Sequence, residues 1–388
     1  MGSGGIFELA WANDQVIARV RDPVPNSHPT PVLPDLSGVE RPELESLLHR
    51  RGHARFRARQ IFNWIYRRGA TRVEEMSNLP RELRVTLASE FTFATPAVTS
   101  RERSTDGNEK FLLQLSDGRR IEAVFIPDTP AQTFCISTQV GCAMACAFCL
   151  TGKMGLVRNL TAGEIVAQVR VLAGALSLRD RSFNVVLMGM GEPLHNYDET
   201  MKALRILADE HGIALPPRRV TLSTVGLPPA LERLAREPIM PNLAISLHAP
   251  TDDLRGALVP INRKYGIGEI IDACRRFPLK KRARITFEYV LLAGVNDRPE
   301  DARQLAKLLP GIKSKVNLIP LNPAAGIPFD RPSDGAIDRF AKTLSDLGLT
   351  VSVRKSRGRD IRAACGQLIV EGERRSPAQQ LASVLSDE

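Results

Sequence analysis

Three cysteines with a short, regular spacing are the residues of this sequence best suited to chemistry. Cys142, Cys146 and Cys149 form the pattern Cys-x3-Cys-x2-Cys. Three thiolates are soft ligands that can hold three irons of a [4Fe–4S] cluster, which leaves the fourth iron open to a chelating substrate or cofactor. A structural zinc site is the alternative, but it needs a fourth Cys or His nearby. Cys135 lies seven residues upstream, which is awkward for one compact tetrahedron.

The composition agrees with a metal or redox role for these thiols. The chain has 388 residues, of which 43% are hydrophobic and 25% charged, as in a soluble protein with one large α/β domain and a smaller module. The start lacks a basic segment followed by an apolar one, and no apolar run reaches the roughly 18 residues of a membrane span. We therefore expect a cytoplasmic protein, in which clustered cysteines bind metal rather than form a disulfide framework.

The elements that would position the cysteines follow a βα pattern from about residue 133. Apolar runs alternate with helical patterns, and Thr161 with Glu164 forms a capping box at the first helix. The expected strands are 134–138, 184–188, 219–223, 242–247, 284–292, 315–320 and 349–353. This pattern predicts an α/β fold with a full or partial β/α barrel, in which chemistry lies at the carboxyl ends of the strands. Polar motifs follow several strands there, at 189–193, 223–224, 246–248 and 321–323.

Four segments flank or precede the predicted barrel, which we place at 133–353. Residues 1–37 have a proline-rich end and are expected to be a poorly ordered leader. Residues 38–95 show helical spacing, and residues 96–132 predict a β-hairpin linker with its turn at 116–119. Residues 354–388 form a C-terminal tail whose first part is polar and contains glycine, which is unlike a packed strand.

The charge of the chain favours a polyanionic partner. Lys and Arg number 53 against 43 Asp and Glu, which gives a net charge of +10. Residues 41–70 hold eight arginines against two acids, and 354–362 hold five basic residues against one. A helical module of this kind suits RNA, although a solvated surface is the alternative. Trp64 and Tyr66 stand between arginines, as in proteins that stack bases, but Trp64 is better explained as a core residue.

The motifs resemble a known superfamily and, more narrowly, a known family. The cysteine loop and the glycine-rich stretch 189–193 resemble the radical S-adenosylmethionine (SAM) superfamily. Further segments resemble the RlmN/Cfr family of RNA adenosine methyltransferases, most closely its RlmN branch. These segments are 135–142, 188–193, 219–224, 244–250, 259–262, 317–323 and 363–368. The resemblance covers about residues 38–370. It implies a partial (β/α)6 radical SAM barrel with a small N-terminal helical accessory domain, a [4Fe–4S] cluster, and two SAM molecules per turnover.

The resemblance also implies a relay of the methyl group through protein thiols. Adenine C2 is too electron-poor to attack the sulfonium methyl of SAM directly. Cys365 would accept a methyl group from one SAM, and a second SAM would be cleaved to methionine and a 5′-deoxyadenosyl radical that takes hydrogen from that methyl. The carbon radical would add to the base. Cys135 would then attack the Cys365 sulfur, leaving a Cys135–Cys365 disulfide. Glu122 matches the family's general base, and Cys274 matches no functional position and is expected in the core.

The family's SAM contacts match residues at the strand ends. Gly191 and Glu192 match the positions that meet the methionine amine, where glycine permits close approach and a carboxylate pairs with ammonium. The other matching positions are Ser223, Ser246, Leu247, His248 and Asn322. Two of these assignments have ordinary alternatives. Glu122 could be an exposed strand carboxylate, and His248 could be a structural histidine.

The implied activity is formation of 2-methyladenosine in 23S rRNA and in tRNA next to the anticodon. The nearest alternative is methylation of adenosine at C8 in 23S rRNA. A rival from another class is an iron–sulfur RNA-binding protein without catalysis. The resemblance further implies an electron donor such as flavodoxin, a monomer, and no membrane partner.

Overall fold

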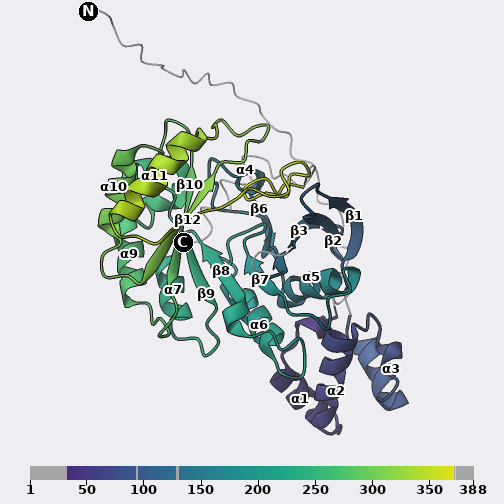
Figure 1. Ribbon diagram of the computed structural model, residues 1–388. Coiled ribbons are helices and arrows are strands. Elements are labelled where there is room, and N and C mark those ends of the chain that lie inside the picture. Colours follow the sequence, from purple (N-terminus) through teal and green to yellow (C-terminus); the bar gives the residue numbers. More distant parts are fainter. Residues whose placement is uncertain (1–32, 93–94, 128–130, 371, 373–388) are drawn as a thin grey trace, which may run out of the picture. The chain divides into compact units, whose positions relative to one another are not determined.

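Parallel strands make up most of the main sheet and run to one of its edges (Figure 1). The computed structural model describes residues 33–92, 95–127, 131–370 and 372. In order across the sheet, the parallel strands are β4 (Thr133–Cys135), β7 (Asn184–Leu187), β8 (Val220–Thr224), β9 (Asn242–Ser246), β10 (Ile285–Leu291), β11 (Ser314–Pro320) and β12 (Val351–Val353). Each predicted strand coincides with one of these within a few residues, and the expected α/β fold is confirmed.

Helices connect successive parallel strands. They are α5 (Ala162–Ala175), α6 (Tyr197–Ala208), α7 (Pro228–Leu234), α8 (Asp252–Leu258), α9 (Ile267–Arg276), α10 (Pro299–Leu308) and α11 (Asp334–Asp346). Helix α5 begins at the predicted capping box, because Thr161 Oγ1 accepts the Glu164 N–H and the Glu164 carboxylate accepts the Thr161 N–H. Cys274 is buried in α9, as expected of a core residue. None of the described helices is long and apolar enough to span a membrane.

Three antiparallel strands extend the same sheet beyond β4. They are β1 (Ala97–Arg103), β2 (Glu109–Gln114) and β3 (Arg120–Ile126), and β3 pairs with β4. The predicted hairpin is present between β2 and β3, but it is an integral part of the sheet and not only a linker. A small separate sheet pairs β5 (Gln139–Gly141) with β6 (Leu156–Asn159), on either side of the cysteine loop and the short helix α4 (Leu150–Met154).

The N-terminal module is helical, as its spacing predicts. It contains a 3-10 turn (Leu36–Gly38), α1 (Arg41–Arg50), α2 (Phe56–Phe62), a π-helical continuation (Asn63–Arg68), a second 3-10 turn (Val73–Glu75) and α3 (Arg81–Glu90). The predicted leader extends to residue 37, but Leu36 is fully buried and its N–H bonds the Thr92 carbonyl. Burial of Leu36 therefore moves the start of the module to about residue 34. Residues 1–32 of the leader lie outside the described residues.

The C-terminal tail follows β12 and contacts first the loop between β1 and β2 and then helix α4. It leaves β12 and runs to the loop between β1 and β2, where Asp106 accepts the Gly358 N–H and Ser104 donates to Asp360. It then passes helix α4, where the Leu150 N–H donates to the Gly366 carbonyl. Residues 371 and 373–388 of the predicted tail lie outside the described residues.

Candidate active site

Two adjoining cavities lie on the inner side of the parallel strands and share lining residues. The first, which we call the carboxyl-end cavity, has a volume of about 160 Å³ and lies where the parallel strands end. The second, which we call the lumen, has a volume of about 650 Å³ and follows the inward faces of the strands toward their amino ends. The residues that line both cavities are Met188, Glu288, Ile319, Asn322, Arg354 and Cys365. Cys365 therefore lies at the junction.

The three clustered cysteines face the carboxyl-end cavity together. Cys142, Cys146 and Cys149 all line it. The loop that carries them packs closely on α4, because a Cβ at Gly152 would lie 2.9 Å from the Cys146 nitrogen. Burial raises the pKa of all three thiols. A bound metal would be needed to hold them as thiolates. Within the described ranges, no three His, Cys, Asp or Glu side chains are placed to hold a single metal ion.

Glu192 lies in the same cavity on a strand-end turn. Its carboxylate accepts the N–H groups of Leu194 at 3.0 Å and Val225 at 2.9 Å, and burial raises its pKa to about 7. Gly191 has φ +103°, and a Cβ there would lie 2.6 Å from the Cβ of Gln139, so glycine is required. An ammonium group in the cavity would supply the positive charge that favours the Glu192 carboxylate.

Of the five remaining predicted SAM contacts, four line the carboxyl-end cavity and one does not. Ser223 and Ser246 face the carboxyl-end cavity with their hydroxyl oxygens 3.3 Å apart. His248 lines the cavity but is also structural, because its Nδ1 accepts the Val290 N–H at 3.1 Å; burial lowers its pKa to about 3. The Leu247 side chain is fully buried and is not among the lining residues. Asn322 faces both cavities, and its Oδ1 is buried without a hydrogen-bond partner.

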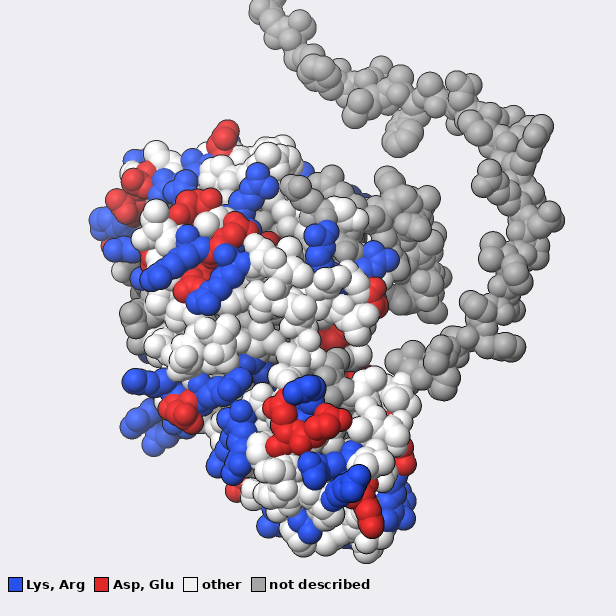
Figure 2. Space-filling model, turned by 90° about the vertical axis from the view of Figure 1, so that its right-hand side faces the viewer, with Lys and Arg blue, Asp and Glu red and all other residues white. Residues whose placement is uncertain are grey.

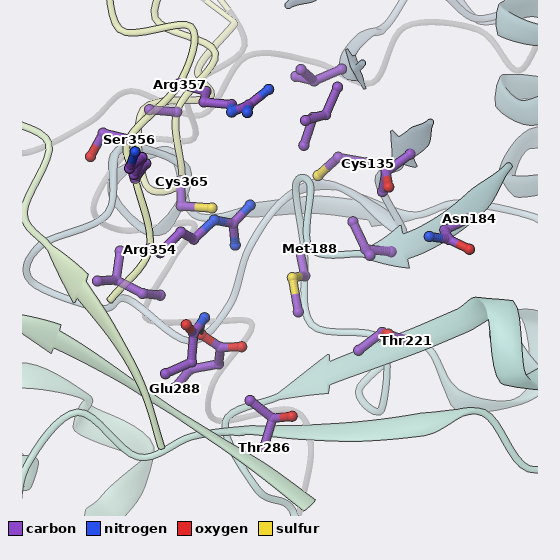
Figure 3. A pocket seen from close by; sticks show the side chains of 18 of the residues that line it. Cys135, Asn184, Met188, Thr221, Thr286, Glu288, Arg354, Ser356, Arg357 and Cys365 are labelled. Carbon is purple, nitrogen blue, oxygen red and sulfur yellow. Dashed lines mark hydrogen bonds between the residues drawn. The ribbon is translucent and has the colours of Figure 1, made fainter. Parts of the chain in front are cut away.

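The two thiols predicted to form the relay come together across 230 residues of sequence. Cys135 ends strand β4 and lines only the lumen, whereas Cys365 on the tail lines both cavities. Figure 3 shows their sulfur atoms pointing into the same space, with the Arg354 side chain beside Cys365. Both thiols are free. Burial, and then the nearby Cys365, raise the pKa of Cys135 to about 12.

Glu122 lies beside the tail and not in either cavity. It is 4% exposed on β3, so the exposed-carboxylate alternative is wrong. Its Oε1 lies 3.2 Å from Lys110 Nζ, and its Oε2 accepts the Ile369 N–H at 2.8 Å. Burial raises the pKa of Glu122, and the charge of Lys110 opposes that rise. The carboxylate thus contacts the segment of the tail that follows Cys365.

Sequence reasoning missed Arg354 and Glu288, which both line the junction of the cavities. Cys365 is the largest cause of the raised pKa of Arg354, and the charges of Glu288 and Cys135 add to the rise. Glu288 is buried on β10 and accepts a hydrogen bond from Asn317 Nδ2 at 2.7 Å. The alternation of Thr286 and Glu288 along an otherwise apolar strand was the signal for an inward polar face.

The fold and the three-cysteine loop define a radical SAM protein. Residues 136–308 match the family model of the radical SAM superfamily, and residues 34–92 match that of the ribosomal RNA large subunit methyltransferase N-terminal domain. A curated relative in Geobacter sulfurreducens, named dual-specificity RNA methyltransferase RlmN, is 51% identical, covering 86% of this chain and 91% of its own. One of the same name in Caulobacter vibrioides is 45% identical over 95% of this chain and 96% of its own.

A solved structure of a radical SAM methyltransferase is also similar to this chain. A radical SAM methyltransferase from Sphaerobacter thermophilus superimposes with a TM-score of 0.82 at 49% identity, covering 86% of this chain and 99% of that chain. The chain belongs to the RlmN family of radical SAM methyltransferases.

The residues present fit the cofactors that this membership implies. Three soft thiols that face one cavity match the three protein ligands of a [4Fe–4S] cluster. The buried Glu192 carboxylate and the unpartnered Oδ1 of Asn322 open onto the same cavity, as expected for a site that binds the polar groups of SAM.

Proposed function

We propose that this chain methylates C2 of adenosine in 23S rRNA and in tRNA beside the anticodon, through methyl-Cys365 and a Cys135–Cys365 disulfide. One observation carries the methyl relay: Cys365 and Cys135, distant in sequence, face the same space next to the cavity of the clustered cysteines. A methyltransferase that used SAM directly would have no need of this pair. The choice of C2 over C8 is supported by the similarity to curated RlmN relatives. We further propose that the parallel strands act as a partial (β/α)6 barrel and that residues 38–95 form the accessory RNA-binding domain.

The carboxyl-end cavity would hold the cluster and SAM. Cys142, Cys146 and Cys149 would bind the cluster, and Glu192 with Gly191 would receive the methionine amine of SAM. Ser223, Ser246, His248 and Asn322 would form the rest of the wall, with Leu247 contributing backbone. The cluster, when bound, would supply the electron that cleaves SAM to methionine and a 5′-deoxyadenosyl radical.

Cys365 would carry the methyl group, and Cys135 would release the product. Cys365 faces both cavities, so it can take a methyl group from SAM on one side and present it to the base on the other. Arg354 would stabilise negative charge on the Cys365 sulfur before methylation. Cys135 would attack that sulfur and release the methylated base as the disulfide forms. Two SAM molecules are consumed per turnover, one for the methyl group and one for the radical.

We expect Glu122 to act as the base that takes a proton from the adduct as aromaticity returns. Glu122→Gln keeps an acceptor for the Ile369 N–H but cannot take a proton. Product formation should fall by about 10²- to 10⁴-fold, while methyl transfer to Cys365 continues. Mass spectrometry of the protein and of digested RNA measures both. Glu109→Gln is the matched control, because Glu109 is a buried carboxylate on β2 that pairs with Arg101. Equal activity of the two variants would refute the assignment.

The helical module offers exposed arginines to RNA. Arg50, Arg55 and Arg59 are exposed, and no described carboxylate pairs with them, whereas Arg41 and Arg51 are held in ion pairs. Figure 2 shows Lys and Arg together with Asp and Glu over the lower part of the molecule, where α1–α3 lie in Figure 1.

Two aromatic rings of the module contact arginine guanidinium groups: Phe56, half-exposed, contacts Arg57, and Trp64 contacts Arg68. Trp64 is half-buried and packs against the core, as the core explanation expects.

Reversing Arg55 and Arg59 to Glu should weaken RNA binding and lower its salt dependence by about one unit of log–log slope for each phosphate that the module no longer neutralises. Cleavage of SAM without RNA should be unchanged. Binding titrations at several salt concentrations give the slope. Arg339→Glu with Lys307→Glu, two exposed positions on α11 and α10, is the control. If both double variants bind RNA like the parent, the module's charges form only a solvated surface.

The decisive test of the function is mass spectrometry of nucleosides from RNA treated with the protein, SAM and a low-potential reductant. Products carrying methyl at C2 in both 23S rRNA and tRNA support the proposal. Methyl at C8 would establish the alternative activity, and no SAM cleavage would indicate a non-catalytic iron–sulfur protein. Action on these RNAs would place the protein in the cytoplasm, and we propose that it works there as a monomer with a protein electron donor such as flavodoxin.

A further inference from the structure

A third cavity, which we call the joint pocket, lies where the helical module meets helix α5 and the loops that precede β7 and β8. Its volume is about 250 Å³. Three arginines line it, one from each of three elements: Arg67 from the π-helical segment of the module, Arg170 from α5 and Arg179 from the loop before β7. Asp180, which is exposed, is the one carboxylate among the described residues that line it. The joint pocket therefore carries an excess of positive charge.

Hydrogen bonds to backbone carbonyls hold two of these arginines in place. Arg67 donates from Nε to the Gly212 carbonyl at 3.0 Å and from Nη2 to the Glu210 carbonyl at 2.6 Å. Arg170 is only 7% exposed, and its Nη2 donates to the Ala70 carbonyl at 3.0 Å. Both sets of bonds join the module to the barrel, so the two guanidinium groups are fixed at the wall of the joint pocket.

Two glycines make room for the third arginine. A Cβ at Gly69 would collide with the Arg179 guanidinium, and a Cβ at Gly174 would lie 2.7 Å from Arg179 Nη2. Gly69 has φ +73° at the end of the π-helical segment, and Gly174 lies in the last turn of α5. No carboxylate in the described part of the chain forms an ion pair with Arg67 or Arg179.

The charges of the joint pocket repel one another. Burial lowers the pKa of Arg170; the nearby Tyr66 and Asp35 oppose that fall, and the charge of Arg179 adds to it. A bound anion would relieve the repulsion between the two guanidinium groups. Guanidinium groups present paired N–H donors that match the oxygens of phosphate, and the pocket has room for such a group with water.

The joint pocket and the lumen lie on either side of the start of β7. Phe183 lines the pocket, whereas the next residue, Asn184, lines the lumen, because successive side chains of a strand point to opposite faces. The loop before β8 likewise runs from Gly212 at the pocket to Arg218 at the lumen. Arg218 and Asn242 line the lumen at the amino ends of their strands and are exposed, so the lumen opens beside the joint pocket.

We propose that the joint pocket binds one phosphate group of the RNA backbone, held by Arg67, Arg170 and Arg179, while the target base enters the lumen from the amino ends of the strands. This inference rests on the proposed function, which places the base on the lumen side of Cys365. Phosphate contacts fix the register of a protein on nucleic acid without reading its sequence. A phosphate held here contacts the module and the barrel together, and it can belong to rRNA or tRNA because both share the same backbone.

The test measures binding of a synthetic tRNA anticodon arm to variants of the full chain. Arg179→Gln should weaken binding about tenfold at low salt and lower the log–log salt slope by about one unit. Gly174→Ala keeps every charge but displaces the Arg179 guanidinium, so it should weaken binding to a similar extent; alanine suits a helix, so α5 is retained. Arg181→Gln is the matched control, because Arg181 is exposed and does not line the pocket. Equal effects of the Arg179 and Arg181 variants would overturn the proposal.

Neutral methylphosphonates placed singly along the same RNA locate the phosphate. One position should weaken binding to the parent chain about tenfold and have no further effect on the Arg179→Gln variant. If no position shows this pattern, the RNA backbone does not use the joint pocket. Inorganic phosphate is the second probe. If Arg179→Gln weakens binding of inorganic phosphate but not of RNA, the pocket holds a free anion and the proposal is wrong.

Methylation of the same RNA by the parent chain is measured separately, so that failure of the function and failure of the pocket can be told apart. A parent chain that shows the methylphosphonate pattern but forms no methyladenosine would refute the function and leave the phosphate site standing. A parent chain that methylates the RNA, with unchanged RNA affinity in Arg179→Gln and Gly174→Ala, would show that only the phosphate site is wrong.

Discussion

The Cys365→Ala variant should put no methyl group on either protein or RNA, whereas the Cys135→Ala variant should become covalently linked to its RNA. Cys365 faces the carboxyl-end cavity and is the only one of the two thiols that lines it. Its removal takes away the proposed methyl acceptor. Cys135 lines only the lumen, so its removal leaves methylation of Cys365 intact and the radical free to join the base. Release then stops, because no second thiol attacks the sulfur.

Denaturing gels with labelled RNA would show the Cys135→Ala adduct as a slower band that depends on SAM and reductant. Peptide mass spectrometry should place the link at Cys365. Cys274→Ala is the matched control, because Cys274 is buried in α9 away from both cavities, and it should methylate RNA normally. If the Cys135 and Cys365 variants behave alike, with neither methyl-protein nor adduct, the division of labour between them is wrong.

The Cys142→Ala variant should lose nearly all bound iron and all cleavage of SAM. The parent chain, reconstituted without oxygen, should hold about four irons per chain, as the cluster requires. Without Cys142, only two of the three proposed thiol ligands would remain, and both have raised pKa values that oppose thiolate formation. Iron analysis and detection of 5′-deoxyadenosine measure the two losses. Cys135→Ala should keep both iron and SAM cleavage. Stoichiometric zinc without iron in the parent would overturn the cluster assignment.

The sequence predicts those parts of the fold whose signals are local. The parallel strands could be found because each is a short apolar run between turn residues, as at 184–188 and 242–247. The start of α5 could be found because Thr161 and Glu164 bond each other's backbone across one turn. The clustered cysteines lie on one loop, so their spacing alone indicates a common site.

Other features depend on contacts that local patterns do not record. Strand β1 (Ala97–Arg103) is exposed along almost its whole length, so it has no apolar alternation, and backbone pairing with β2 alone defines it. The position of Arg354 depends on the path of the tail, which has no periodic structure. Glu122 is buried because the tail covers it at Ile369, and that contact joins residues 247 apart in sequence. Its burial could not be read from β3 alone.

The polar interior of the strands also affects how this family can change over evolutionary time. Outward residues such as Leu222 and Leu318 are fully buried against the helices, and truncation of such a side chain typically costs about 2–5 kcal/mol. Inward positions such as Thr221 and Thr286 border the lumen, so exchanging them leaves no new void. We therefore expect substitutions at such inward positions to cost less stability than substitutions in the outer apolar layer. A lineage can alter what the interior admits without first acquiring a more stable scaffold.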